Sequence, residues 1–215
     1  MNDVVIRPLR FTAEVDAMRA FLEAVGLRAR IESERGGWAV LLAGRGAISL
    51  HDAATSDTGG QPGQTSLTFE AEDIDELKDT LISAGYDDAT IWDEAFGRVL
   101  SATGPDGTKL WIDERSEDLY GYKVNETRPD ERWSVTPYLA GADQAAWERL
   151  LDVLGTDQQV HFGAGETFAV RPDLTTTAEL DEVAQRLVAA GYAATRTDGG
   201  LELVDPDGQS LVVHG

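Results

Sequence analysis

An internal repeat constrains the fold of this chain more than any other feature of its sequence. Residues 75–86 (DELKDTLISAGY) recur as residues 181–192 (DEVAQRLVAAGY), with the acidic pair, the apolar positions and the final Ala-Gly-Tyr in one register. A Pro-Asp-Gly turn followed by an apolar segment, residues 105–112, recurs as residues 206–213. Self-similarity of this kind indicates that one supersecondary unit is used more than once.

Each copy has the pattern of a strand, a helix and further strands. Residues 65–71 alternate between apolar and polar side chains, which is typical of a strand with one buried face. Leu77, Leu81 and Ala84 follow at helical spacing, and Gly85 is suited to end that helix. We expect the remaining strands of this unit near residues 88–93, 97–103 and 108–113.

The N-terminal segment repeats this layout without the turn motif. It predicts a strand near residues 3–11 and a helix near residues 13–25 that ends at Gly26. Three strands are expected after it, near residues 28–34, 37–42 and 46–51.

A third unit begins at Trp133 and is shorter than the others. A strand near residues 134–140 and a helix before Gly155 are followed after about ten residues by the next strand, so one or two strands are missing. The sequence therefore predicts two domains joined by a charged, turn-rich linker. They are residues 1–115, with units at 1–52 and 64–113, the linker 116–132, and a shortened second domain at 133–215.

Charge and composition exclude several classes of function. The chain has 39 acidic and 18 basic residues, a net charge of -21, and no cysteine. This charge repels nucleic acid and anionic membranes, so neither is expected as a partner. Disulfides, thiolate metal sites and cysteine nucleophiles are excluded. With no long apolar run or secretory pattern, we expect a cytoplasmic protein.

The four units in tandem resemble two domains of the vicinal oxygen chelate superfamily, which includes glyoxalase I, bleomycin-resistance proteins and extradiol dioxygenases. The segment FLEAVG, residues 21–26, is similar to the family's first helix, and residues 104–112 are similar to its last hairpin. The resemblance implies an α+β fold in which tandem βαβββ units form curved mixed sheets around a small-molecule cavity. The second domain would be a degenerate copy.

The resemblance also implies where a metal would be held. One ligand comes from each of four strands, and these positions fall at about Ile6, Ser49, Ser66 and Trp111. None of the four is a usual metal ligand, so we expect no metal and no other cofactor. In the second domain Val212 takes the closing position, and only His161 and His214 offer imidazole.

A displaced metal site is the alternative, because His51, Glu70 and Asp113 would share faces with three of those positions. Each lies two or four residues from its family position, roughly 7 Å or more along its strand, which disfavours convergence on one ion. The same groups could instead form the polar rim of a cavity.

The candidate ligand-binding residues are those predicted to face the cavity. Trp111 is among them because Leu110 and Ile112 take the helix-facing side of the last strand, whereas the faces of Trp38 and Trp92 are not assignable from the pattern. The predicted set comprises Arg10, Ser49, His51, Ser66, Thr68, Glu70, Lys109, Trp111 and Asp113.

These residues favour metal-independent binding of a small molecule, of which drug sequestration is one version. The acidic surface suits a cationic ligand. Whether the protein is an enzyme stays open: the alternative is a lyase or isomerase that uses a displaced metal site or Glu70 or His51 as general base. A third possibility is a degenerate paralogue with a closed cavity. The chain is expected to be a monomer, as a pseudo-dimer of its domains, or a homodimer.

Overall fold

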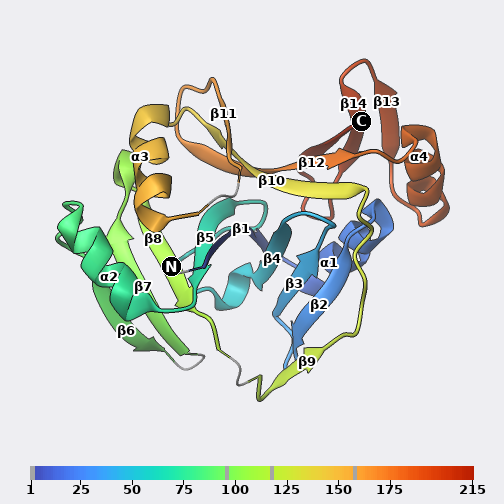
Figure 1. The fold of residues 1–215 in the computed structure, drawn as a ribbon. Helices are drawn as coiled ribbons and strands as arrows, with labels where there is room; N and C mark the ends of the chain where they lie inside the picture. The colour runs from blue at the N-terminus through green and yellow to red at the C-terminus, as the bar shows by residue number, and fades with distance from the viewer. Residues whose placement is uncertain (1–2, 95–96, 117–118, 157–158) are drawn as a thin grey trace. The chain divides into compact units, whose positions relative to one another are not determined.

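A computed structural model describes residues 3–94, 97–116, 119–156 and 159–215. Four α-helices and fifteen strands lie in this part of the chain (Figure 1). Their order is β1 (Val4–Thr12), α1 (Val15–Val25), β2 (Arg28–Ser33), β3 (Trp38–Leu42), β4 (Ala47–Asp52), β5 (Thr65–Ala71), α2 (Ile74–Ser83), β6 (Thr90–Glu94), β7 (Gly97–Thr103), β8 (Lys109–Glu114), β9 (Tyr122–Val124), β10 (Trp133–Ala140), α3 (Gln144–Leu154), β11 (His161–Gly163), β12 (Ala169–Thr176), α4 (Leu180–Ala189), β13 (Ala194–Thr197), β14 (Gly200–Val204) and β15 (Ser210–His214).

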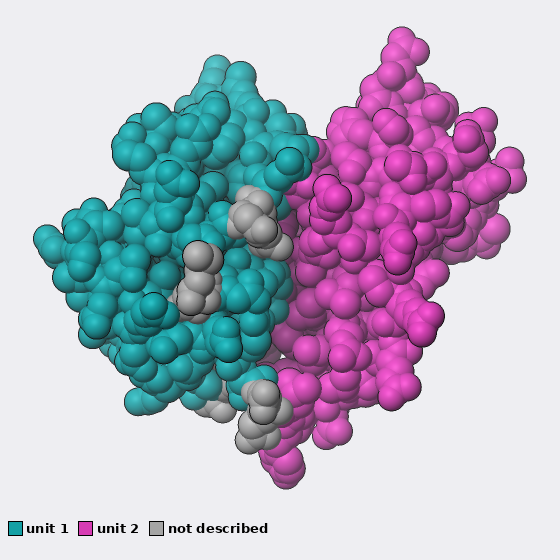
Figure 2. Space-filling model, in the orientation of Figure 1, with its two compact units in different colours: residues 1–7, 66–118, 137–171 teal, residues 8–65, 119–136, 172–215 magenta. Residues whose placement is uncertain are grey.

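The chain divides into two compact units, each built from separated segments (Figure 2). Unit 1 comprises residues 1–7, 66–118 and 137–171, and unit 2 comprises residues 8–65, 119–136 and 172–215. The chain passes from one unit to the other within β1, β5, β10 and β12. Each unit therefore combines one predicted βαβββ repeat from the N-terminal half with one from the C-terminal half. The two tandem domains predicted from the sequence follow the order of the repeats along the chain. As a division of the molecule into domains, they stay a prediction.

Unit 1 is organised around helices α2 and α3. Its strands follow the order β6-β7-β8-β5, and residues 4–7 of β1 come next to β5. The β7–β8 pair is antiparallel and the β5–β8 pair is parallel, so the sheet is mixed. Both helices begin with an aspartate whose side chain accepts from a backbone N–H, Asp73 in α2 and Asp143 in α3. The core side chains of this unit include Val4, Ile6, Leu67, Phe69, Leu77, Leu81, Leu110, Ile112, Trp147, Leu150 and Leu154.

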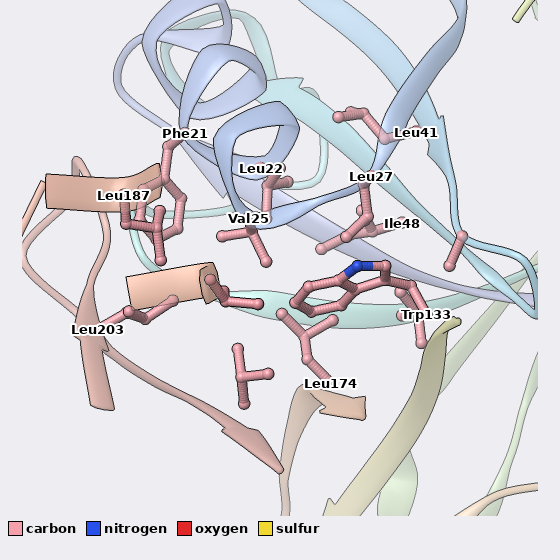
Figure 3. Close-up of a cluster of buried hydrophobic side chains, with 14 of the residues drawn as sticks. Phe21, Leu22, Val25, Leu27, Leu41, Ile48, Trp133, Leu174, Leu187 and Leu203 are labelled. Carbon is pink, nitrogen blue, oxygen red and sulfur yellow. The ribbon is translucent and has the colours of Figure 1, made fainter. Parts of the chain in front are cut away.

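Unit 2 has the same plan with helices α1 and α4. Its strands follow the order β4-β3-β2-β9 beyond residues 8–12, and β12-β15-β14-β13 in the second sheet. Trp133 is fully buried and lies among side chains of α1 and the strands (Figure 3). Gly26 ends α1 with φ 145°, and a Cβ at that position would stand 2.4 Å from the Trp133 ring. Glycine is therefore required at this position for two reasons, the positive φ at the end of the helix and the close approach of the Trp133 ring.

The predicted elements agree closely with the structure, with one difference in the expected linker. Residues 116–132 contain the short strand β9, which pairs antiparallel with β2 through Ile31 and Val124. In the shortened third repeat, only the three-residue strand β11 lies between α3 and β12 in the described residues. None of the described helices is long and apolar enough to cross a membrane.

The alternation of side chains along each strand determines which of them face the core and which face away from it. Leu67 and Phe69 of β5 and Leu110 and Ile112 of β8 are at most 3% exposed and lie in the unit 1 core, as the sequence predicts. Because neighbouring residues of a strand point to opposite faces, the residues between them lie on the other face of the sheet. We call this the open face of unit 1.

Candidate functional site

The centre of the open face of unit 1 is an arginine held between two carboxylates. Glu70 of β5 and Asp113 of β8 are direct partners in the parallel β5–β8 pair. Arg7 of β1 lies 3.1 Å from Glu70 Oε2 through one terminal nitrogen and 3.6 Å from Asp113 Oδ2 through the other. The Arg7 side chain is only 11% exposed, so this contact is shielded from solvent. Its Nε is buried without a hydrogen-bond partner among the described residues.

Two further donors complete the cluster. Arg115 donates from Nε to Glu70 Oε1 at 2.9 Å and forms an ion pair with Asp3. Trp111 donates from its indole Nε1 to Asp113 Oδ1 at 3.0 Å. Both oxygens of Glu70 are thus engaged by guanidinium groups, whereas Asp113 has one indole donor and a longer contact to Arg7. The two carboxylates differ in environment although they lie side by side.

Burial raises the pKa of Asp113 above its ordinary value, and the negative charge of Glu70 acts in the same direction. The Arg7 charge and the Trp111 hydrogen bond oppose this rise without cancelling it. The Asp113 side chain keeps 32% of its surface exposed. A carboxyl that is shielded by protein and still reachable from solvent can exchange a proton or bind a cationic or hydrogen-bonding group.

Aromatic side chains border this cluster. Lys109 lies on the Trp111 ring, with Nζ 5.3 Å from the ring centroid. Trp92 of β6, 51% exposed, donates from Nε1 to Ser101 Oγ at 3.0 Å, and Ser101 is the direct strand partner of Trp111. Trp92 therefore lies on the same face as Trp111. The sequence pattern left Trp92 unassigned, because β6 has no clear alternation of apolar and polar residues.

The predicted site residues are divided between the two units. Those of unit 1, on β5 and β8, are Ser66, Thr68, Glu70, Lys109, Trp111 and Asp113. Thr68 is 5% exposed, and its hydroxyl donates to the Arg7 carbonyl at 3.0 Å, so it supports the strand pair more than it offers a donor. Arg10, Ser49 and His51 belong to unit 2.

Within unit 2, Arg10 lies on the opposite side of β1 from the side expected. It is in register with the core residue Leu50, and its guanidinium pairs with Asp205 and donates to the Gly63 carbonyl. Ser49 and His51 are instead in register with Leu9 and Phe11. The even-numbered residues of β1 face the core, so Arg10 is used in a buried ion pair and is not on the face of Ser49 and His51.

The same alternation explains the residue that sequence reasoning missed. The resemblance placed a ligand position at about Ile6, but Ile6 is 2% exposed and lies in the core of unit 1. The side chain of its neighbour Arg7 lies on the open face. The signal was present in the sequence, since Val4 and Ile6 alternate with Arg7.

The described residues do not fit a metal centre of the kind that the fold family uses. Of the implied ligand positions, Ile6 is in the core, and serine and tryptophan at the others supply no imidazole or carboxylate. The nearby carboxylates Glu70 and Asp113 are held by Arg7, which already supplies the positive charge between them. Nowhere in the described parts of the chain do three or more histidine or acidic side chains form a group able to hold a metal ion.

The fold is that of the vicinal oxygen chelate proteins, an α+β arrangement of βαβββ repeats in mixed sheets, which confirms the predicted fold class. Solved structures with a similar fold include catechol 2,3-dioxygenase, which has 13% sequence identity and a TM-score of 0.63, with 99% of this chain and 87% of that chain covered. No protein-family model matches the sequence, and no curated protein matches it.

Two further structures show the same similarity. The 2,2',3-trihydroxybiphenyl 1,2-dioxygenase of Sphingomonas wittichii strain RW1 is 14% identical, with 98% and 88% of the two chains covered and a TM-score of 0.61. A Mn(II)-bound glyoxalase of Novosphingobium aromaticivorans is 14% identical, with 97% and 80% covered and a TM-score of 0.57. At these identities the likeness shows the fold, and function must be argued from the site.

Proposed function

We propose that the protein binds a small organic molecule on the open face of unit 1 without a metal. The observation that carries this proposal is the Arg7–Glu70–Asp113 cluster, with Trp111 beside it, on a sheet face that does not pack into the core. A sheet face that served only as protein surface would need neither shielded charges nor a half-buried indole. A few fixed polar groups beside an aromatic surface are typical of a ligand site.

The chemistry favours a flat, cationic ligand. The indole of Trp111 offers a surface for stacking, and Asp113 offers a carboxylate oxygen with weaker engagement than those of Glu70. The net charge of -21 raises the local concentration of cations near the surface. Binding without transformation, as in sequestration, needs nothing beyond these groups.

The enzymatic alternative is a cofactor-free isomerase or lyase. The raised pKa of Asp113 favours it as the proton-transfer group, because a general base works best when its pKa approaches the working pH. Glu70 is less available for proton transfer than the sequence suggested, since both of its carboxylate oxygens contact guanidinium groups. A displaced metal site at His51, Glu70 and Asp113 has weaker support, because Arg7 lies between the last two.

Native mass spectrometry of freshly purified protein, beside the mass of the denatured chain, tests this proposal. We expect a mass excess that matches an organic compound, or its appearance after incubation with flat organic cations, and the same spectrum gives the subunit count. Trp111→Ala and Asp113→Asn should each weaken that binding about tenfold, while Val204→Ser, at a 52% exposed position, should not.

Two results would overturn the proposal. One is a divalent ion bound per chain whose removal by a chelator abolishes ligand binding. The other is a retained compound whose affinity is unchanged in Trp111→Ala and Asp113→Asn. Turnover lost in Asp113→Asn with unchanged affinity would instead favour the isomerase or lyase.

A further inference from the structure

The sequence contains three Asp-Gly pairs, and one of them differs from the other two in how its side chain is held. They are Asp106-Gly107, Asp198-Gly199 and Asp207-Gly208. In an Asp-Gly pair the aspartate side chain is easily attacked by the next backbone nitrogen, because glycine has no Cβ to keep the two apart. In a folded protein this attack also requires that the carboxyl and the nitrogen are free to approach each other.

Asp106 is held by two hydrogen-bond donors at the start of α3. Its Oδ2 accepts from the backbone N–H of Asp143 at 3.2 Å and from Trp147 Nε1 at 3.0 Å. The Trp147 side chain is fully buried, so this donor has a fixed position. The Asp106 carboxyl can turn towards Gly107 only by giving up both hydrogen bonds.

Asp207 is restrained at both of the groups that would react. Its Oδ1 accepts from Thr12 Oγ1 at 3.1 Å and from the Ala13 N–H at 3.0 Å, and its side chain is only 2% exposed. The nitrogen that would attack is also engaged, since the Gly208 N–H donates to the Asp205 carbonyl at 2.9 Å. Neither the carboxyl nor the nitrogen is free at this pair.

Asp198 has none of these restraints. Asp198 and Gly199 are the exposed two-residue loop between β13 and β14, which the strand pair of Thr197 with Gly200 closes. Among the described residues, the Asp198 carboxyl accepts no hydrogen bond and the Gly199 N–H donates none. The Gly199 carbonyl accepts from His214 Nδ1 at 2.9 Å, which restrains that oxygen and leaves the nitrogen free.

We infer that Asp198 is the residue at which the folded chain converts aspartate to isoaspartate, while the fold protects Asp106 and Asp207. The Gly199 nitrogen forms a bond to Cγ of the protonated Asp198 carboxyl, and one water leaves, made of the carboxyl hydroxyl and the amide proton. A second water opens the succinimide ring at the former main-chain carbonyl of Asp198. The bond from that carbonyl to the Gly199 nitrogen breaks, so the chain runs through the side chain with its mass unchanged. The reaction needs only water.

The product changes the hairpin that carries it. The backbone of the loop gains one carbon atom, because it now passes through Cβ of Asp198. The length of a hairpin loop fixes how its two strands pair, so the added atom should weaken the β13–β14 pair. Since β13 is the last strand of its sheet, hydrogen exchange should become faster in residues 194–197. Unchanged exchange there would contradict this consequence.

The test compares the three sites in the folded protein and in the chain unfolded by guanidinium chloride, both kept at pH 7 and 37 °C. Cleavage after basic residues and after glutamate separates residues 197–202, with Asp198, from residues 203–215 and 99–109, with Asp207 and Asp106. Chromatography and methyl transfer by an isoaspartyl methyltransferase quantify the product in each peptide. Asp198 should convert at about its unfolded rate. Asp106 and Asp207 should be slowed about tenfold or more, the cost of giving up two hydrogen bonds.

Gly199→Ala is the matched variant. Gly199 has no positive φ, and a Cβ there would meet only Thr197 Oγ1 at 3.9 Å, so this variant should fold as the natural chain does. Its methyl group crowds the attacking nitrogen and should slow conversion of Asp198 about tenfold or more. Asp198→Glu should remove the product from residues 197–202. Equal slowing of all three sites by folding, or an unchanged rate in Gly199→Ala, would overturn the inference.

Discussion

The two compact units share a plan and differ in what they place off the core. In each, two helices cover a core to which one large indole contributes, Trp147 in unit 1 and Trp133 in unit 2, both fully buried. In each, an aspartate of a Pro-Asp-Gly turn accepts hydrogen bonds next to the start of a helix of the other repeat, α3 for Asp106 and α1 for Asp207. The repeated sequence therefore specifies the same packing in both units.

The chemistry off the core is not repeated. Unit 1 has charged groups on its open face, whereas unit 2 pairs the rings of Trp38 and Tyr122 and keeps the ion pair of Arg10 with Asp205 buried. Side chains that face the core are fixed by packing, so they are constrained to be alike in both copies. Side chains on the other face are not constrained by core packing and are free to differ between the two units.

The largest expected loss of stability comes from truncating a core side chain in one unit only. Trp133→Ala leaves a cavity among α1 and the strands of unit 2 and should lower the free energy of unfolding by about 3–5 kcal/mol. Urea denaturation measures the loss. Hydrogen exchange should show faster exchange in residues 8–65 and 172–215 than in residues 66–116. Equal acceleration in both regions would contradict two separate cores.

Next in size is the contrast between the two β1 arginines. Arg10→Met leaves the Asp205 carboxylate, 7% exposed, without its cation and should cost about 3 kcal/mol or more. Arg7→Met should cost about 1–2 kcal/mol, because Glu70 retains Arg115 and Asp113 retains Trp111. Urea denaturation of both variants gives the comparison. A larger loss in Arg7→Met would mean that the unit 1 cluster is the structural one.

The same β1 strand shows how far the sequence could predict the molecule. Local patterns fixed the helices and most strands to within a few residues, because alternation and helical spacing are local properties. The candidate site was harder to predict. Alternation within the strands assigned Glu70, Trp111 and Asp113 to the face on which the structure has them. Arg7 was missed because the family position was carried to Ile6, and a step of one residue along a strand reverses the face. Pairings such as Arg10 with Asp205 join distant segments, and no local pattern reports them.

A smaller effect separates the two turn aspartates from ordinary turn residues. Asp106 Oδ2 accepts from Trp147 Nε1 at 3.0 Å, and Asp207 Oδ1 accepts from Thr12 Oγ1 at 3.1 Å. Asp106→Ala and Asp207→Ala should each lower the free energy of unfolding by about 1–2 kcal/mol. The matched Asn variants keep an acceptor and should lose less than half of that. If the Asn and Ala variants unfold at the same urea concentration, the side-chain acceptor contributes nothing to stability.

The smallest effect is a pH dependence that belongs to unit 1. Because burial raises the pKa of Asp113, its charged form is penalised in the folded state at neutral pH. That penalty is fully present above the folded-state pKa and is lost as the pH falls through it towards the value of the unfolded chain. Asn at this position can still accept from Trp111 but carries no charge.

Asp113→Asn should therefore raise the melting temperature by roughly 1–2 °C at pH 7. The shift is small because about a third of the Asp113 side chain is exposed and solvent screens its charge. The gain should shrink as the pH falls through the raised pKa of Asp113, because the natural side chain then loses its charge. Thermal melts of both proteins from pH 7 to pH 4 measure it. A variant that is less stable than the natural chain at pH 7 would show that Arg7 outweighs burial, and that Asp113 acts as a permanent anion on the open face of unit 1.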